Sequence, residues 1–533
     1  RFCQVTGVQT CALPICLKVI ADWITQHITM WALIATGLFL TVVTRGVQVR
    51  HLPTMIRQVA SSRSGAGGGI SSFQAFAISL AARVGVGNVF GVAAALLYGG
   101  PGAVFWMWVV ALVGMATAFF EATLAQIFKV RAPDGSFRGG PAFYMARGMG
   151  GAGGRALAGV FAVITLVTCG FIITSVQSNA VAGTLVAALG GGEGSALPGF
   201  GGLSAAQLVV AGLVLVLTAV VVFGGIRAVA RVTEWMAPIM ALIYIVLVAL
   251  ICLMNLGDFW RVIGQIISSA FAPEPLAGGL GGGLLAAVIN GTKRGLFSNE
   301  AGQGTAPNAA ATATVAHPVQ QGLIQSLGVF VDTIVVCTAT ALIVLLSGVY
   351  TPEGTRAMGE TAAKDAASTL TSSSVGAVLG GWTEYLMAAI IFVFAYSSLL
   401  GNYTYAEVNM DFLRGTGHRH YALRAMIVVA TGIGAMASLT FVWNLSDVVM
   451  GLMAVINIVA IVLLGKWAFG ALADWEAQKR LLDTGQISEI RFVAEDNPHL
   501  PGALPGDVWS RANAGRIEPA ADDDRERDPQ YVQ

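Results

Sequence analysis

The sequence predicts an all-α, polytopic membrane protein. Of its 533 residues, 55% are hydrophobic and only 11% are charged, and the mean hydropathy is +0.72. Such values are typical of a chain whose solvent is the lipid bilayer and argue against a soluble enzyme. The formal net charge of +1 is spread through the loops. It offers no basic face for nucleic acid, so we expect no partner of that class.

Eleven apolar stretches are long enough to cross a bilayer, which takes about 20 helical residues. The seventh is interrupted, and its two short pieces count as one crossing. In chain order the stretches cover residues 19–43, 73–97, 104–128, 157–189, 208–223, 229–253, 259–271 with 283–297, 323–349, 385–408, 422–442 and 448–469. An odd number of crossings predicts that the two termini lie on opposite sides of the membrane.

Lysine and arginine are concentrated in alternate loops, which predicts the orientation. These loops follow the first, third, fifth, seventh and ninth stretches and hold Arg45, Arg50, Arg57, Arg63, Lys129, Arg131, Arg138, Arg147, Arg155, Arg227, Arg231, Lys293, Arg294, Arg414 and Arg419. Basic loops stay in the cytoplasm. We therefore expect a bacterial inner-membrane protein with its N-terminus outside and its C-terminus inside.

The second stretch does not read as a continuous helix. Gly85 and Gly87 flank Val86 and are followed by Asn88, so helix propensity collapses where lipid offers the backbone no hydrogen-bond partner. A break at mid-membrane is stable if its free N–H groups face a carboxylate and its free carbonyls face a cation. The alternative is that these glycines only let helices pack closely.

The seventh stretch carries a matching interruption, with Pro273, Pro275 and a run of glycines. Once the first stretch is set aside as an accessory helix, the two interrupted helices are the first and sixth of ten core helices. This pattern is typical of transporters built from two inverted five-helix repeats, with the site between the breaks. We expect an accessory helix and cytoplasmic loop at 17–70, one repeat at 71–258 and the other at 259–470.

The two ends of the chain are expected to lie outside this core. Residues 1–16 lack the basic-then-apolar order of a signal peptide and look like a non-native, adaptor-like segment. Residues 471–533 are expected to form an amphipathic helix on the cytoplasmic surface, followed from about residue 496 by a disordered tail.

Three segments closely resemble the alanine/glycine:cation symporter family. They are GGPGAVFWMWVVALVG at 99–114, GGPAFY at 139–144 and NGTKRGLFSNEAGQGTAPN at 290–308. The similarity extends from about residue 19 to residue 474. It implies a LeuT-like fold and sodium-driven uptake of a small neutral amino acid, alanine or glycine.

The resemblance also implies which residues contact cargo and ion. For the substrate they are Val86, Gly87, Gln177, Phe271, Gly279, Ser398 and Asn402, with Phe271 as a cap over the pocket. For sodium they are the carbonyls of Ala81 and Val84, the Asn88 amide, and the hydroxyls of Ser397 and Ser398. The family often has an aromatic residue where Asn402 stands, which leaves the choice of amino acid open. The two serines can also simply bond back to their own helix.

Three charged residues lie inside predicted spans: Arg83, Glu121 and Asp332. Arg83 is a permanent cation whose burial costs about 2.5 kcal/mol or more if it is unpaired. It can bind the substrate carboxylate, stand in for a sodium ion, or form a structural ion pair with Glu121 or Asp332. For the two acids the structural reading is favoured.

These observations predict a sodium-coupled symporter without a further cofactor. On the same fold, the alternatives are a symporter for glutamine or a D-amino acid, or one that is coupled to protons. From another functional class, the alternatives are a channel and a transporter-like sensor. The histidines show no catalytic spacing to a nucleophile or acid, so we expect no enzymatic activity. The sequence makes no prediction about the oligomeric state.

Overall fold

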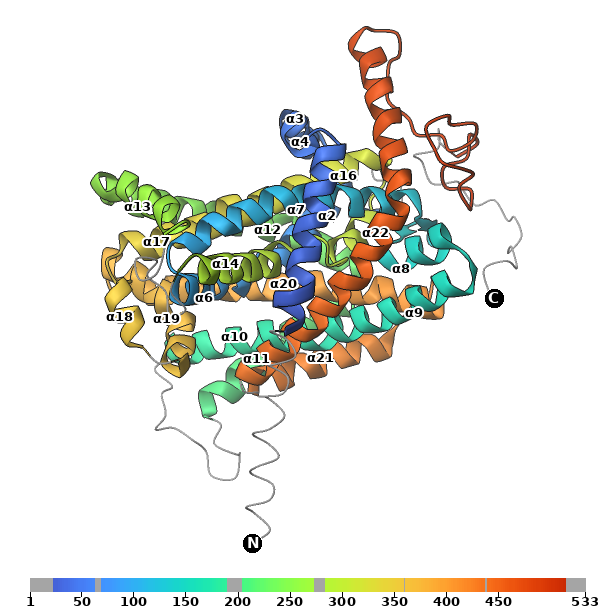
Figure 1. Cartoon of the computed structure of the whole chain (residues 1–533). Helices are drawn as coiled ribbons and strands as arrows, with labels where there is room; N and C mark the ends of the chain where they lie inside the picture. The colour runs from blue at the N-terminus through green and yellow to red at the C-terminus, as the bar shows by residue number, and fades with distance from the viewer. Residues whose placement is uncertain are drawn as a thin grey trace.

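The computed structural model describes residues 23–62, 69–188, 204–272, 283–358, 360–436 and 439–513, and within them it is almost entirely helical (Figure 1). The first half contains η1 (Thr25–Thr29), α2 (Met30–Val43), α3 (Val47–Arg50), α4 (Leu52–Ser61), α5 (Ser72–Arg83), η2 (Gly87–Gly91), α6 (Val92–Gly99), α7 (Gly102–Ile127), β1 (Val130–Arg131), β2 (Phe137–Arg138), α8 (Pro141–Tyr144), η3 (Met145–Met149), α9 (Gly151–Val167), η4 (Thr168–Ile173), α10 (Thr174–Ala188), α11 (Ala205–Val222) and α12 (Gly225–Met254). The second half contains α13 (Leu256–Ser269), α14 (Gly283–Asn299), α15 (Ala306–Ala311), α16 (Pro318–Val329), η5 (Phe330–Cys337), α17 (Thr338–Leu346), α18 (Pro352–Ala357), α19 (Glu360–Leu379), α20 (Thr383–Arg414), α21 (Tyr421–Met436) and α22 (Leu439–Asp483).

The predicted crossings correspond to helices of the structure. Among the described residues, eight helices are long and apolar enough to span a membrane, and the bent pair formed by α5 with η2 and α6 makes nine. The shorter apolar helix α21 matches the tenth stretch. The helices α13 and α14 match the two halves of the seventh. The prediction of an all-α polytopic membrane protein is confirmed.

The first core helix is broken where the glycines predicted it. Its first half, α5, begins with a capping box in which Ser71 and Gln74 exchange side-chain-to-backbone hydrogen bonds. It ends at Arg83, because Val84 leaves the helical region with ψ 88°. The chain resumes at Gly87 and is bent by 50° across the gap. The residues of the second predicted break, 273–282 with Gly279, lie outside the described part of the chain, as do residues 1–16.

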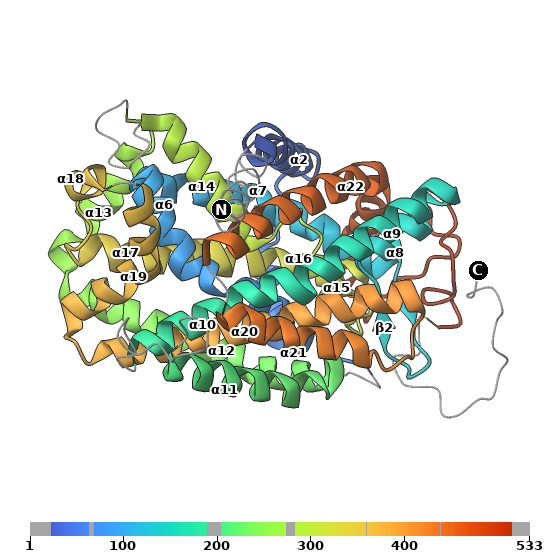
Figure 2. The same ribbon diagram turned by 90° about the horizontal axis from the view of Figure 1, so that it is seen from below.

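The core helices pack side by side around this break. Seen from below, α10, α20 and α21 run alongside one another, with α11 at the edge (Figure 2). The helix α20 also packs against α5, and α14 packs against α6 and α7. Four elements therefore surround the gap: α10, α14, α20 and the seventh core helix, formed by α16, η5 and α17.

The C-terminal segment differs from the expectation. Residues 471–483 are not a separate surface helix, because α22 continues without interruption to Asp483 and protrudes from the bundle (Figure 1). The following residues, as far as 513, are irregular but anchored on the bundle. The indole of Trp509 donates to the Gln126 carbonyl at 2.9 Å, and the Phe492 amide donates to the Ala316 carbonyl at 3.0 Å. Aromatic anchors interrupt an otherwise polar stretch, so composition alone did not reveal the docking. Residues 514–533 lie outside the described part.

One contact of this region makes it sensitive to pH. His317, which caps the first turn of α16, is fully buried; its Nε2 lies 3.1 Å from an Asp474 carboxylate oxygen, and its Nδ1 accepts from the Val319 amide. Burial lowers the pKa of His317 below its ordinary value. The pKa of His317 is therefore lower in the folded protein than in the unfolded chain, so the unfolded chain binds the proton more readily. As a result, the stability of the fold decreases as the pH drops from about 6.5, the unfolded pKa, toward the lower pKa of the folded state.

We expect the thermal unfolding temperature of the purified protein to be lower at pH 5.5 than at pH 7.5. This decrease should be smaller in His317→Gln. The measurement is thermal unfolding followed by intrinsic fluorescence at the two pH values. Exposed His418→Gln is the control and should leave the fall unchanged. An equal fall in wild type and His317→Gln would contradict the assignment.

Candidate substrate and cation site

The gap between α5 and η2 is wholly buried and lined by polar groups. The Gly85 amide donates to the Asn88 side-chain oxygen at 3.0 Å, and the Val86 amide lies 3.4 Å from the Gln177 oxygen of α10. The ring of Phe297, on α14, lies against Gly87, where it would be 3.1 Å from an added Cβ. The structure thus brings Val86, Gly87 and Gln177 together, as predicted. A small solute carrying a carboxylate can replace the Gln177 oxygen as the acceptor of the Val86 amide.

A second cluster lies directly behind the gap. The side-chain nitrogen of Asn88 donates to Ser298 at 3.0 Å and to the Asp332 carboxylate at 2.7 Å. The other Asp332 oxygen accepts from Ser298 at 2.7 Å and from Thr333 at 2.8 Å. All four residues are at most 1% exposed. Three helices thereby place a carboxylate and two hydroxyls around one point, beside the donating nitrogen of Asn88 and the Cys337 thiol. The hard oxygens of the carboxylate and the hydroxyls suit a monovalent cation.

Sequence reasoning missed this cluster. It gave Asn88 a place in a cation site but left Asp332 with a structural reading, and it did not single out Ser298. The nearness of these residues comes from the packing of α14 and η5 against η2, over separations of 210 and 244 residues from Asn88. The one local signal was a charge within an apolar span, which by itself marks a functional residue.

The two serines of α20 differ: one contacts the first core helix, and the other bonds back to its own helix. The Ser398 hydroxyl donates to the Ala82 carbonyl at 2.7 Å, which places it at the end of α5, and Asn402 donates to the Ser398 carbonyl at 2.9 Å. Ser397 instead donates to Phe394 in its own helix, at 2.9 Å, and faces Met240. The structure thus brings Ser398 to the gap, beside Ala82 and Gly85, whereas Asn402 bonds back to its own helix. It leaves Ser397 in the back-bonded alternative.

Phe271 does not lie at the gap. Its side chain is 57% exposed and packs edge-on against Phe105 and Trp106, with ring centroids 5.1 and 6.0 Å away. The predicted cap over the pocket is therefore corrected. The ring sits on the outer face of α7, and Phe297 of α14 is the aromatic residue that covers Gly87. The motif carried by the resemblance located an aromatic residue near the second break but could not say which way it points.

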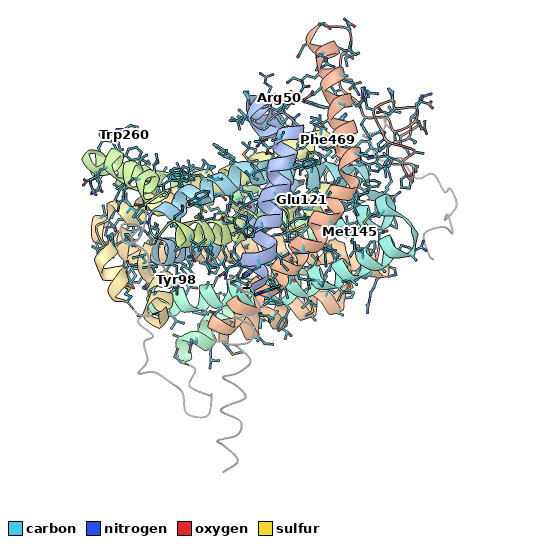
Figure 3. All side chains as sticks on the ribbon, in the orientation of Figure 1. Arg50, Tyr98, Glu121, Met145, Trp260 and Phe469 are labelled. Carbon is cyan, nitrogen blue, oxygen red and sulfur yellow. The ribbon has the colours of Figure 1, made fainter. Side chains whose placement is uncertain are left out.

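Glu121 holds the segment that follows α14. It lies within α7, in the middle of the bundle (Figure 3). Its carboxylate accepts from the Gly302 and Gly304 amides, both at 2.9 Å, and from the Asn457 side chain on α22 at 2.5 Å. Both glycines have positive φ, 85° and 82°, which favours glycine. Glu121 thus fixes the glycine-rich turn structurally, in agreement with the favoured reading.

Arg83 forms neither of the predicted ion pairs. It is 3% exposed at the end of α5, and one guanidinium nitrogen donates to the Gln325 carbonyl at 3.2 Å. Its Nε and Nη2 atoms have no hydrogen-bond partner among the described residues, and no carboxylate there is within ion-pair distance. The predicted structural pair with Glu121 or Asp332 is therefore wrong. Arg83 acts on these carboxylates only through its longer-range field.

A cavity of about 540 Å³ lies between α10, α19 and α20. It is lined by Thr184 of α10, Ser372 of α19, Glu384 of α20 and Phe90 of η2. Phe90 stands two residues beyond Asn88. The cavity therefore lies close to the half of the first core helix that follows the gap.

Close packing of α20 on α5 gives a stability prediction. An added Cβ at Gly401 would lie 2.6 Å from the Ala82 Cβ and 2.8 Å from its backbone nitrogen. Gly401→Val should therefore force the helices apart at the gap, lower stability by about 1–3 kcal/mol and abolish function. Gly159→Val, where nothing lies within 4 Å of the added Cβ, is the control. Thermal unfolding of both variants tests the prediction, and an unfolding midpoint for Gly401→Val equal to that of the control would contradict it.

A bundle of membrane-spanning helices whose first core helix is broken, with buried polar groups around the gap, is typical of a membrane transporter. The family model described as "Sodium:alanine symporter family" matches residues 11–488, and the chain belongs to this family.

Individual relatives agree with this assignment. The chain is 41% identical to the amino-acid carrier protein AlsT of Bacillus subtilis over 494 residues, which cover 92% of this chain and 97% of that protein. It is 39% identical to the probable sodium/glutamine symporter GlnT of the same organism over 463 residues, which cover 86% of this chain and 90% of that protein. Among solved structures, MhsT in complex with L-phenylalanine matches 80% of this chain and 94% of that one, with 15% identity and a TM-score of 0.47.

Proposed function

We propose that this protein is a sodium-coupled symporter that imports a small neutral amino acid, alanine or glycine, across the bacterial inner membrane. It would use the LeuT-like inverted repeat that the resemblance implies, with its N-terminus outside and its C-terminus in the cytoplasm. The observation that carries the proposal is the broken helix whose Asn88 is bonded to Ser298 and Asp332 in a buried cluster. The family name supports sodium and alanine as ion and cargo.

The substrate carboxylate binds at the amides of Val86 and Gly87, where the outer half-helix begins. Aligned N–H groups at a helix start favour a negative charge. The Gln177 side-chain oxygen, which accepts from the Val86 amide at 3.4 Å in this structure, would turn away and accept a hydrogen bond from the substrate's ammonium group instead. Phe297 against Gly87 and the close approach of Ser398 to Gly85 leave room for a small side chain only.

Sodium binds at the Asp332 cluster. The carboxylate of Asp332 and the hydroxyls of Ser298 and Thr333 supply oxygen ligands, and Asn88 links them to the gap. The Ala81 and Val84 carbonyls with Ser398 offer a second position at the end of α5. Because the ion and the carboxylate lie within one break, each strengthens the binding of the other, and the two bound together favour one conformation over the other.

The test is uptake by purified protein in liposomes. Radiolabelled alanine or glycine should accumulate against its gradient when sodium is imposed outside, and not when choline replaces it. Vesicles without protein and vesicles treated with a sodium ionophore are the controls. Absence of sodium-dependent accumulation of either amino acid would defeat the proposal.

A second candidate cargo deserves the same assay. Asn402 stands where the family often has an aromatic residue, and its amide lies by Ser398 at the gap. A relative is a probable sodium/glutamine symporter. Competition by glutamine and D-alanine, repeated with a proton gradient in place of sodium, distinguishes these alternatives. Non-saturating flux would point to a channel, and no flux of any solute to a sensor.

A further inference from the structure

A buried polar seam joins the gap to the predicted cytoplasmic end of the bundle. It runs along the contact between α5 and α16 and is formed by Ser72, Ser79, Arg83, Gln321 and Gln325, all at most 9% exposed. On α5 these residues lie seven and four positions apart, and on α16 four apart, so each set occupies one helix face. From Ser72 to Arg83 the seam spans about 16 Å, roughly half of the hydrocarbon thickness.

The members of the seam are hydrogen-bonded in one continuous chain. The Gln321 amide donates to the Ser72 carbonyl at 3.3 Å, and Gln325 donates to Gln321 at 3.3 Å. Ser79 donates to Gln325 at 2.6 Å, and Arg83 donates to the Gln325 carbonyl at 3.2 Å. Elsewhere α5 is packed with alanine, leucine and phenylalanine side chains. Hydrogen-bonded amides are common between membrane helices, where they stabilise the contact; this row differs in that it continues along the helix contact as far as Arg83.

Arg83 stands at the head of this seam, with no carboxylate within ion-pair distance in the described part of the chain. Gly328 of α16 provides the space for its guanidinium, because a side chain there would overlap Nη1. Nε and Nη2 of Arg83 have no hydrogen-bond partner among those same residues. Its charge acts on the carboxylates of Glu300 and Asp332. An uncompensated cation at this position opposes the passage of another cation, and a carboxylate bound at Val86 and Gly87 would offset that repulsion.

We propose that the seam between α5 and α16 is the inner exit route for sodium, and that Arg83 is its electrostatic gate. Without substrate, the guanidinium repels sodium from the seam. With substrate, the amino acid's carboxylate neutralises the guanidinium's field, and sodium leaves as α5 moves away from α16. Arg83 thus couples the two fluxes without binding sodium. The inference rests on the proposed function for the identity of cargo and ion.

The first test is sodium flux in the absence of amino acid. Arg83→Gln in liposomes should raise substrate-independent ²²Na⁺ entry roughly tenfold over wild type, since a unit charge a few ångström away contributes more than 1 kcal/mol. The ratio of amino acid to sodium transported should fall. Arg83→Lys keeps the charge and should keep the leak low. A higher half-saturating amino-acid concentration without a leak would instead make Arg83 a carboxylate ligand and overturn the gate.

The second test does not depend on the stability of an Arg83 variant. Ser79→Cys, in inside-out vesicles with sodium and alanine, should react with a membrane-impermeant thiol reagent about tenfold faster than Ala77→Cys, an equally buried position on another face of α5. Mass spectrometry of the labelled peptide distinguishes the introduced cysteine from the native cysteines. Equal rates at the two positions, with alanine uptake intact, would overturn the seam. If the wild-type protein took up no alanine but Arg83→Gln still showed the sodium leak, the proposed cargo would be wrong and the role of Arg83 as a gate would be supported.

Discussion

Asp332→Asn is expected to abolish sodium-driven accumulation, with a loss of at least about 100-fold in uptake at limiting sodium. The substitution preserves size but removes the negative charge that accepts from Asn88, Ser298 and Thr333. A buried charge near 4 Å from the ion is worth about 4 kcal/mol at an effective dielectric constant of 20, and each 1.4 kcal/mol is about tenfold in affinity. The measurement is the sodium dependence of amino-acid uptake in liposomes.

The matched control is Thr333→Val. It removes a donor to the same carboxylate but keeps the charge, so its uptake should fall by roughly tenfold, which corresponds to about 1.5 kcal/mol, the lower end of the value of a hydrogen bond to a charged group. Both variants should elute as single species in size-exclusion chromatography. If Asp332→Asn kept the sodium dependence of the wild type, the assignment of the sodium site to this cluster would be wrong.

Glu121→Ala is expected to have the largest effect on stability. The carboxylate accepts two backbone amides and the Asn457 side chain, and it joins α7, the glycine-rich turn after α14, and α22. Its removal leaves buried donors unsatisfied at about 1–3 kcal/mol each. We expect a destabilisation of roughly 3–6 kcal/mol and loss of transport. The measurement is the thermal unfolding midpoint in detergent.

Two variants bracket this result. Glu121→Gln keeps one acceptor oxygen and should lose about half as much stability as Glu121→Ala. Asp258→Asn changes an exposed carboxylate on α13, whose pair with Arg261 lies at the surface, and should have little effect, as exposed ion pairs contribute about 0–1 kcal/mol. An unfolding midpoint for Glu121→Ala equal to that of Asp258→Asn would show that the turn is held by other contacts.

The features that follow from local chemistry were predictable from the sequence. Gly85 and Gly87 interrupt the helix because of their own propensity, and the structure bends the chain there by 50°. The apolar stretches likewise fixed the spans. The family resemblance predicted Val86, Gln177 and Ser398 at one site, and the structure brings all three to the gap.

Features that depend on tertiary packing were not predictable. Asp332 and Ser298 meet Asn88 only because separate helices fold against one another. The direction of the Phe271 ring and the absence of an ion pair at Arg83 are likewise set by packing. The docked segment up to residue 513 depends on the Trp509 and Phe492 anchors, whose partners lie far away in the sequence.

The central claim is that one break in the first core helix holds amino acid and sodium together. It is tested most directly by the affinity of purified wild-type protein for radiolabelled alanine as sodium is titrated against choline. The account predicts that the dissociation constant for alanine falls as sodium rises, and that alanine lowers the dissociation constant for sodium by the same factor. Alanine binding of equal strength in sodium and in choline would contradict it.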